Sequence, residues 1–465
     1  MARSCGTCRD RRISCDRATP TCAQCARSNR VCKGYGMRLS WPKASDGRRA
    51  AVAGPPHHRR AGRQLLSSSL VNVSDFDIKL HYHLSSSFPS DNASLSLTVP
   101  VPFTSIVVTD TDGQLFEYFE STASRSLAIL GHDPVGLGRT LIRMALANTS
   151  PSSAAVRYSL LGLSSLHRHG LQAHCFEFKI SAIKALNEAT HAEIGPAEAL
   201  QHVAAGMLLC SFEIHKASCT SSQWRWFITG VKHVLNASAL LPFRQDCVFC
   251  VLMDWVFYHE TLGRFSVLHW RPAVQLEEHP RSAVCSCADN LPPTPTNTLL
   301  RLFRLGCYSL ATNRDLGPAI EPLRDVARAI QHLPIPDDPD PTFELFQLSI
   351  LIYFNRITSS ALEPQGTTQS RIQRGLAIFG TLHSCPRQFP LFIIGCEART
   401  EEERRTILEL IDRTQKSASS RSTFIVGELT NRVWVQDDLA GDEELGYREK
   451  MDAIVSVCSL LPTFV

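Results

Sequence analysis

The chain has 465 residues, 44% hydrophobic and 20% charged, which is ordinary for a soluble globular protein. No apolar run approaches the roughly 18 residues that a membrane-spanning helix needs, so we expect no membrane partner. The net charge of +4 hides an asymmetry, because residues 1–63 hold 15 Lys and Arg against 3 Asp and Glu, and the others hold 33 against 41. A basic N-terminal part on an acidic remainder is typical of a polyanion-binding module attached to a soluble body.

Residues 4–34 contain six regularly spaced cysteines, in the sequence SCGTCRDRRISCDRATPTCAQCARSNRVCKG. The pattern Cys-x2-Cys-x6-Cys occurs twice, first at Cys5, Cys8 and Cys15 and then at Cys22, Cys25 and Cys32. Two thiols separated by two residues can bind one metal ion from a single turn, and a third closes the site. Two separate tetrahedral zinc sites need eight ligand positions, which six thiolates supply only if two sulfurs bridge both ions. The spacing therefore predicts one binuclear cluster with two Zn2+ ions.

This segment resembles the Zn2Cys6 binuclear cluster of fungal transcription factors. Besides the cysteines it carries the basic run CRDRRISCD at residues 8–16 and Pro20 between the two halves. The resemblance implies two short helices around the zinc site, with Cys5 and Cys22 as the bridging ligands. Ser14 departs from the family, which usually has a basic residue there that contacts phosphate. A disulfide framework is disfavoured, because the first residues, MARSCGTCRDRR, lack the apolar segment of a secretory signal.

The resemblance also implies how the module binds double-stranded DNA. A short helix of the first half-repeat enters the major groove, and Arg11 and Arg12 read a CGG-type triplet. The other basic residues, among them Arg9 and Lys33, contact phosphate and set the register of the module on the DNA. Two Zn2+ ions and six thiolates carry a net charge of −2, which DNA would repel. The basic side chains around them are therefore needed to make the local electrostatic field positive. The competing interpretation is a zinc module that contacts only protein.

Residues 42–104 are predicted to form a linker that is first basic and then rich in serine. Its arginines suit phosphate contact or nuclear import, and equally a solvated tail. No heptad repeat occurs in residues 44–104, so the sequence is compatible with a monomer and with a homodimer.

Residues 105–465 are predicted to form a large all-α domain. Residues 114–130 hold apolar and aromatic residues without the alternation of a strand, and apolar residues recur at helical spacing in residues 154–166 and 173–189. Residues 247–265 are apolar nearly all round and predict a central buried helix, whereas the proline-rich residues 277–298 and 333–342 predict loops. Cys247 and Cys250 have the spacing of half a metal site, but their apolar surroundings favour core packing.

This region resembles the regulatory domain that accompanies Zn2Cys6 modules in fungal transcription factors. The resembling stretches are SLLGLSSLH at 159–167, WFITGV at 226–231, WVFYHE at 255–260 and FPLFIIGCEARTEEERRTILELI at 389–411. The resemblance implies a nuclear regulator that acts with the transcription machinery on RNA polymerase II genes. At the level of the family, we expect these genes to be a metabolic gene set.

The chain carries no P-loop, GxGxxG, GxSxG or HExxH motif, so we expect no enzyme activity and no catalytic residues. The acidic residues 434–445 resemble an activation segment, although a solvent-facing edge of the domain is the favoured interpretation.

Overall fold

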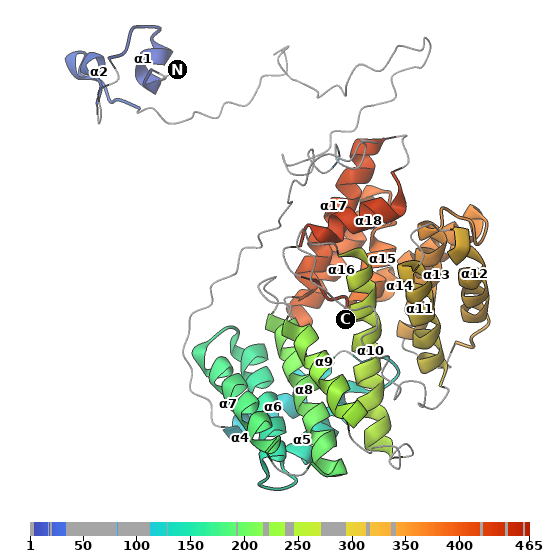
Figure 1. Ribbon diagram of the computed structural model, residues 1–465. Helices are drawn as coiled ribbons and strands as arrows, with labels where there is room; N and C mark the ends of the chain where they lie inside the picture. The colour runs from blue at the N-terminus through green and yellow to red at the C-terminus, as the bar shows by residue number, and fades with distance from the viewer. Residues whose placement is uncertain are drawn as a thin grey trace. The chain divides into compact units, whose positions relative to one another are not determined.

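The computed structural model describes residues 4–16, 18, 21–33, 81, 112–127, 129–191, 194–216, 223–237, 246–270, 294–312, 317–335, 341–418, 422–441, 445–458 and 461–465 (Figure 1). The chain divides into two compact units, Met1–Ser69 and Leu70–Val465. Apart from His81, the linker predicted for residues 42–104 lies outside the described residues.

The described part of the N-terminal unit contains two short helices, α1 (Gly6–Asp10) and α2 (Ala23–Arg27), which contact each other. Cys22 caps α2, because its side chain accepts a hydrogen bond from the backbone N–H of Cys25. The predicted fold of two short helices that carry the cysteines is confirmed.

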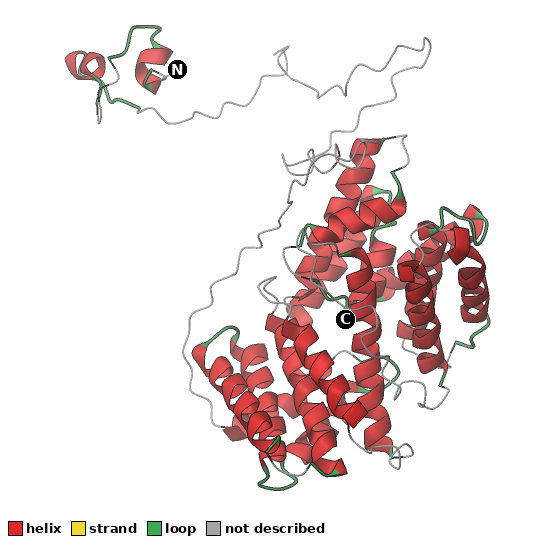
Figure 2. Ribbon diagram, in the orientation of Figure 1, coloured by secondary structure: helices red, strands yellow, loops and turns green. Residues whose placement is uncertain are grey.

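The described part of the C-terminal unit is all-α, as predicted, with helices and loops and no strand (Figure 2). Its first part comprises α4 (Asp112–Ser121), the 3-10 helix η1 (Ala123–Ser126), α5 (Pro134–Ala145), α6 (Pro151–His169), α7 (Ala173–Ala189), α8 (Pro196–Lys216) and α9 (Gln223–Ala237). The long α10 (Cys247–His269) is followed by α11 (Pro295–Thr312), α12 (Gly317–Gln331), α13 (Thr342–Ile357) and α14 (Gln365–Thr381). The last part comprises α15 (Gln388–Gly395), α16 (Glu401–Ala418), α17 (Ser422–Ala440) and α18 (Tyr447–Ser456).

Several helices begin where a short polar side chain can cap them. Asp133 accepts hydrogen bonds from two backbone N–H groups of α5, and Ser150 accepts one from α6. Both helices then continue with proline, which suits the first turn because it lacks the N–H that would be unpaired there. Asp246 caps α10 through the N–H groups of Val248 and Phe249, at 2.7 and 3.2 Å.

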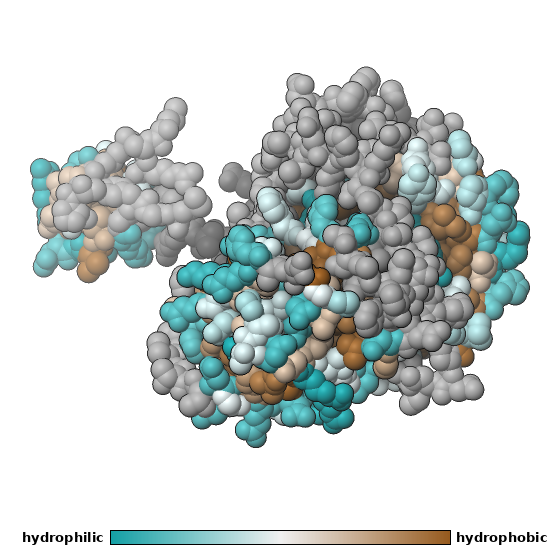
Figure 3. Space-filling view, turned by 60° about the horizontal axis from the view of Figure 1, so that its bottom comes forward, coloured by the Kyte–Doolittle hydropathy of each residue, from teal (hydrophilic) through white to brown (hydrophobic). Residues whose placement is uncertain are grey.

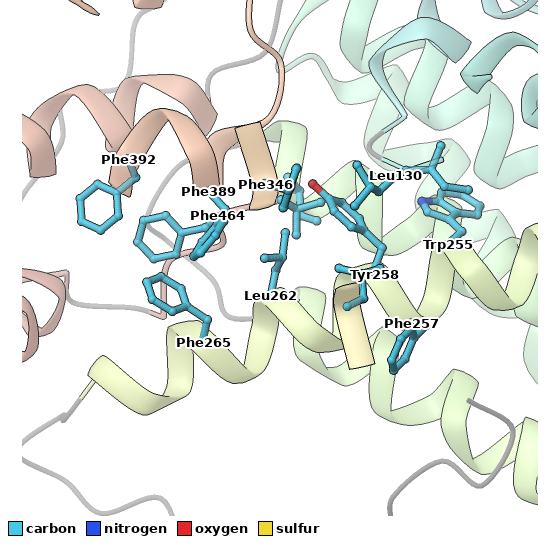
Figure 4. Packing of buried hydrophobic residues seen from close by; sticks show 14 of the residues in the cluster. Leu130, Trp255, Phe257, Tyr258, Leu262, Phe265, Phe346, Phe389, Phe392 and Phe464 are labelled. Carbon is cyan, nitrogen blue, oxygen red and sulfur yellow. The ribbon is translucent and has the colours of Figure 1, made fainter. Parts of the chain in front are cut away.

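The centre of this unit is α10, which is buried from Phe249 to Phe265 at almost every position. Phe265 makes edge contacts with Phe389 of α15 and with Phe464 near the end of the chain, at centroid distances of 5.0 and 5.2 Å (Figure 4). At the end of α10, the buried His269 bonds Asp452 of α18 at 2.7 Å and Tyr353 of α13 at 2.8 Å. The core therefore joins helices that are far apart in the sequence, and the predicted central helix is confirmed.

Three expectations from the sequence need correction. Within residues 114–130, α4 ends at Ser121 and η1 covers Ala123–Ser126, so the stretch forms no single helix. The loop predicted for residues 277–298 ends earlier, because Thr294 caps α11 through the N–H of Asn297 and Pro295 occupies its first turn. The core packing predicted for Cys247 and Cys250 holds only for Cys250, which is half-buried and packs against the core; Cys247 is exposed, because the first turn of α10 lies at the edge of the core.

None of the described helices has the length and apolarity that would let it cross a membrane. The coloured part of the surface in Figure 3 is largely hydrophilic, with separate small apolar patches. Separate apolar patches of this kind are ordinary on the surface of a folded domain.

Candidate metal centre and nucleic-acid interface

The two halves of the N-terminal unit repeat the same backbone conformation. Cys5 and Cys22 are 17 residues apart and precede α1 and α2 respectively. Each helix is closed by the same hydrogen bond, from Ile13 N to Cys8 O at 3.1 Å and, 17 residues later, from Arg30 N to Cys25 O at 3.0 Å. These bonds span five residues, as in a Schellman-type helix end.

Such a helix end needs one residue in the left-handed conformation, which Arg12 supplies with φ 54° and Asn29 with φ 47°. Asparagine tolerates this conformation comparatively well, whereas a long side chain such as that of arginine adopts it at a cost. The first half-repeat therefore keeps an arginine where the backbone disfavours it.

The six thiols lie together as two overlapping sets of four. One set contains Cys5, Cys8, Cys15 and Cys22, the other contains Cys5, Cys22, Cys25 and Cys32, and the sulfur atoms within each set lie within 4.8 Å of one another. Cys5 and Cys22 belong to both sets, and their sulfurs are 3.6 Å apart. Four thiols at this spacing suit a tetrahedral zinc ion, so the residues present fit the group that the sequence predicts.

Backbone N–H groups support the sulfurs that both sets share. Cys8 N donates to Cys5 Sγ and Cys25 N donates to Cys22 Sγ, both at 3.3 Å. Without a metal ion, burial raises the pKa of the thiols of Cys8, Cys22 and Cys25. A metal that binds here must displace protons, and the N–H groups are placed to stabilise the thiolates that result.

Two polar side chains outside the cysteines, those of Thr7 and Asp16, hold the module closed. Thr7 donates to Val31 O at 2.8 Å and accepts from Lys33 N at 3.1 Å, which ties the end of the second half to α1. Asp16 accepts a hydrogen bond from Ala23 N, which lowers the pKa of its carboxyl and fixes the start of α2. These roles were missed from the sequence, because they depend on contacts between the two halves.

The predicted DNA-contacting residues lie around α1. Arg11 Nη1 donates to Ser28 Oγ at 3.0 Å, across the two halves, while Arg12 is exposed and makes no hydrogen bond within the described residues. Lys33 Nζ pairs with Asp10 at 3.2 Å, and both side chains are exposed. Arg9 lies in α1, and its side chain is outside the described part. The exposed Ser14 directly precedes Cys15.

Other candidate sites do not gather ligands. Among the described residues, the two thiol sets are the groups that could hold a metal, so Cys247 and Cys250 form no such site. The described part of the acidic segment, residues 434–441 and 445, is not simply a solvent-facing edge, because Trp434 is buried in α17 and donates to Gly395 O at 2.9 Å. Asp442, Glu443 and Glu444 lie outside the described residues. Asp437 pairs with Arg399 and Lys450, at 2.8 and 2.5 Å.

Comparison with known proteins agrees with this arrangement. The fungal Zn(2)-Cys(6) binuclear cluster domain matches residues 3–42, and the fungal specific transcription factor domain matches residues 114–299 and 314–458. Transcription factor iacI of Pestalotiopsis fici is 38% identical to the chain over 384 residues, which are 79% of this chain and 99% of that protein. No solved structure matches the chain.

Proteins with these two domains bind zinc through the cysteine cluster, regulate transcription by binding DNA in the nucleus, and are generally not enzymes. The two domain matches cover most of the chain, and the relative is matched over nearly its whole length. The chain therefore belongs to the fungal Zn2Cys6 transcription factors.

Proposed function

We propose that this protein is a zinc-dependent, sequence-specific regulator of RNA polymerase II genes that reads CGG-type triplets. The observation that carries the proposal is the pair of thiol sets that share Cys5 and Cys22, with the exposed Arg12 on the adjoining helix end. A rigid metal core beside exposed basic side chains is the arrangement that a small DNA-reading module needs. Control of a metabolic gene set is an expectation from the family resemblance.

In this proposal the six cysteines hold two Zn2+ ions. Cys8 and Cys15 would hold the first ion and Cys25 and Cys32 the second, with Cys5 and Cys22 bridging both. The metal has a structural role, because Zn2+ has no redox chemistry and a site closed by four thiolates has no open position.

Arg12 is the proposed base reader, together with Arg11. The guanidinium fork can donate two hydrogen bonds to guanine O6 and N7, which is worth roughly 1–3 kcal/mol of discrimination. Among the described residues no hydrogen bond occupies the donors of Arg12, whereas Arg11 bonds Ser28 and fixes the second half-repeat against the first. Lys33 and Arg9 would contact phosphate, which adds affinity without sequence preference.

We place the DNA-binding module in residues 1–41, a linker in residues 42–104 and the regulatory domain in residues 105–465. The regulatory domain would meet the transcription machinery in the nucleus and carry no catalytic residue. The protein would bind DNA as a monomer or as a homodimer, and the stoichiometry on a single-site duplex distinguishes the two.

The test is a titration of the full, zinc-loaded chain on two duplexes, one with CGG triplets and one with the same bases scrambled. Arg12→Ala should lower the ratio of specific to non-specific affinity about tenfold or more, because one bidentate base contact is lost. Lys33→Ala is the matched control: it should leave the ratio nearly unchanged and reduce the salt slope by about one unit.

If Arg12→Ala lowered the affinity for both duplexes equally, Arg12 would not be a base-reading residue. A wild-type protein that does not distinguish the two duplexes at any salt concentration would instead favour a module that contacts protein.

A further inference from the structure

Three cations surround one carboxylate where α9, α10 and α11 pack together in the C-terminal unit, Leu70–Val465, which we call the helical unit. Glu260 of α10 pairs with Lys232 Nζ at 2.9 Å, with Arg264 Nη2 at 3.1 Å and, at 3.8 Å, with Arg304 Nη1. Although burial opposes ionisation, Lys232, Arg304 and Arg264 hold the pKa of Glu260 below its ordinary value. The carboxylate is therefore charged, and the cluster contains four charged groups.

The cluster has more positive than negative charge. Three cations and one carboxylate leave an excess of two positive charges, and Glu260 is the one acidic partner of each cation among the residues that the structure describes. The side chains of Lys232 and Arg304 are each only 13% exposed, and that of Arg264 is 33% exposed. Water screens such groups only in part, so excess charge here is costly unless a counter-charge is present.

The cluster also holds hydrogen-bond donors that its own carboxylate does not satisfy. Arg304 lies over the Phe257 ring at 5.6 Å, and its distance to Glu260 exceeds that of a hydrogen bond. The Nε–H group of Arg264 is buried and has no hydrogen-bond partner within the described residues. A buried donor without a partner is unfavourable, and a guanidinium presents its donors in a fork that matches carboxylate and phosphate oxygens.

We propose that Lys232, Arg264 and Arg304 form a binding site for a small dianion that carries carboxylate or phosphate groups. Such an anion supplies the two missing negative charges and accepts hydrogen bonds from the unsatisfied guanidinium groups. Because the three cations come from three helices, the bound anion stabilises the packing of α9 and α11 on α10. The inference concerns the helical unit only and does not depend on DNA binding by the zinc module.

The helical unit offers a matched control at another buried glutamate. Glu213 pairs with Lys179 at 2.6 Å and with Lys216 at 3.7 Å, and Lys179 also donates to Gln223 Oε1 at 2.9 Å. The side chain of Lys179 is 13% exposed, the same fraction as that of Lys232. Lys179→Met and Lys232→Met therefore remove equally buried lysines, but only the second belongs to the cluster with unsatisfied guanidinium donors.

The experiment measures thermal unfolding of the full, zinc-loaded chain with millimolar inorganic phosphate or succinate, each against sodium chloride at equal ionic strength. Either dianion should raise the melting temperature of the wild type, because a ligand that binds only the native state stabilises it. Lys232→Met and Arg304→Met should weaken the apparent affinity for the dianion about tenfold or more, since a charged hydrogen bond is lost. Lys179→Met should lower the melting temperature measured without added dianion, but the dianion should still raise it as much as in the wild type.

A response to phosphate alone or to succinate alone supports the site and identifies which oxyanion it takes. If Arg304→Met does not fold, Glu260→Gln replaces it: removing the resident negative charge should strengthen the dianion response. The proposal is overturned if the wild type does not respond, or if Lys179→Met loses the response as fully as Lys232→Met.

Discussion

Asp10 is an acidic side chain within the basic run of the zinc module, at the end of α1. Its carboxylate pairs with Lys33 across the module at 3.2 Å. An exposed pair of this kind is worth only about 0–1 kcal/mol, so a DNA phosphate can take Lys33 from it. If Lys33 contacts phosphate as proposed, the Asp10 carboxylate would lie near the DNA backbone and repel phosphate.

Asp10→Asn should therefore raise the affinity for every duplex and steepen the salt slope, because it removes a negative charge that repels phosphate and a partner that competes for Lys33. The measurement is a DNA titration at three salt concentrations on the CGG and scrambled duplexes. The double variant with Lys33→Ala should lose most of the gain. A changed preference between the two duplexes would show instead that Asp10 takes part in base reading.

His215 of α8 is buried, and its Nε2 bonds Ser126 O at 3.3 Å. Burial and the neighbouring His167 lower the pKa of His215 from 6.5 to about 4. Between these two values the unfolded chain binds more protons than the native one, so the free energy of unfolding rises with pH in this window. The contribution of His215 is full above the unfolded pKa and is lost as the pH falls towards 4.

Lowering the pH from about 7 to about 5 should thus remove about 2 kcal/mol of stability through this residue. Urea unfolding of the wild type and of His215→Asn at both pH values isolates the effect, since asparagine keeps a donor and does not titrate. The same pH dependence in both proteins would contradict the assignment.

Helix packing in the helical unit depends on a glycine at one close crossing. In α11, a Cβ added to Gly306 would lie 2.1 Å from the ring of Phe354 in α13, which is fully buried. In α9, by contrast, Gly230 is exposed and has nothing within 4 Å of an added Cβ. The two glycines are both helical and differ in what surrounds them.

Gly306→Ala should destabilise the helical unit by about 1–3 kcal/mol, because the core must shift to admit the methyl group. Gly230→Ala should stabilise it by about 0.5–1 kcal/mol, through the smaller conformational entropy of the unfolded chain. Urea unfolding of the two variants checks both signs. A neutral Gly306→Ala would mean that α11 and α13 can move apart at this crossing without loss of stability.

The sequence predicts the helices better than their ends or their partners. The spacing of apolar residues over 173–189 matches α7 (Ala173–Ala189), and the apolar residues of α10 identify the central helix. The start of α11 was missed, since a proline suits a loop and a first helical turn alike. At the Glu260 cluster, the sequence predicts only the pair with Arg264, which lies four residues further along the same helix. The pairs with Lys232 and Arg304 depend on how other helices pack.

The same limit holds for the metal centre. The six cysteines and their division into two sets with shared members follow from their number and spacing. The contacts of Thr7 with Val31 and of Arg11 with Ser28 do not, since they exist only after the two half-repeats have closed on each other.

At the scale of the whole molecule, the two units are stabilised in different ways. The helical unit has one large core, whereas in the module Val31 is 87% and Ile13 is 36% exposed, and the buried cluster consists of cysteines. Zinc binding must then supply the folding free energy of the module, on the order of 10 kcal/mol or more for such sites.

Chelation of zinc should therefore unfold the module and abolish DNA binding, while the far-ultraviolet circular dichroism of the chain stays nearly constant. The control is readdition of zinc, which should restore binding to the CGG duplex. A large loss of helical signal on chelation would show a second metal site in the helical unit.

The membership of Cys5 and Cys22 in both thiol sets has a consequence for how the module responds to the zinc supply. If the module holds two Zn2+ ions as proposed, the first would order both half-repeats and with them two of the four ligands of the second, so the conformational entropy of ordering would be lost once for two binding steps. Uptake then becomes cooperative, and half-loaded molecules are scarce at any free zinc concentration. The module would switch between empty and full over a narrow range of free zinc, which gives a gene regulator a threshold in place of a graded response.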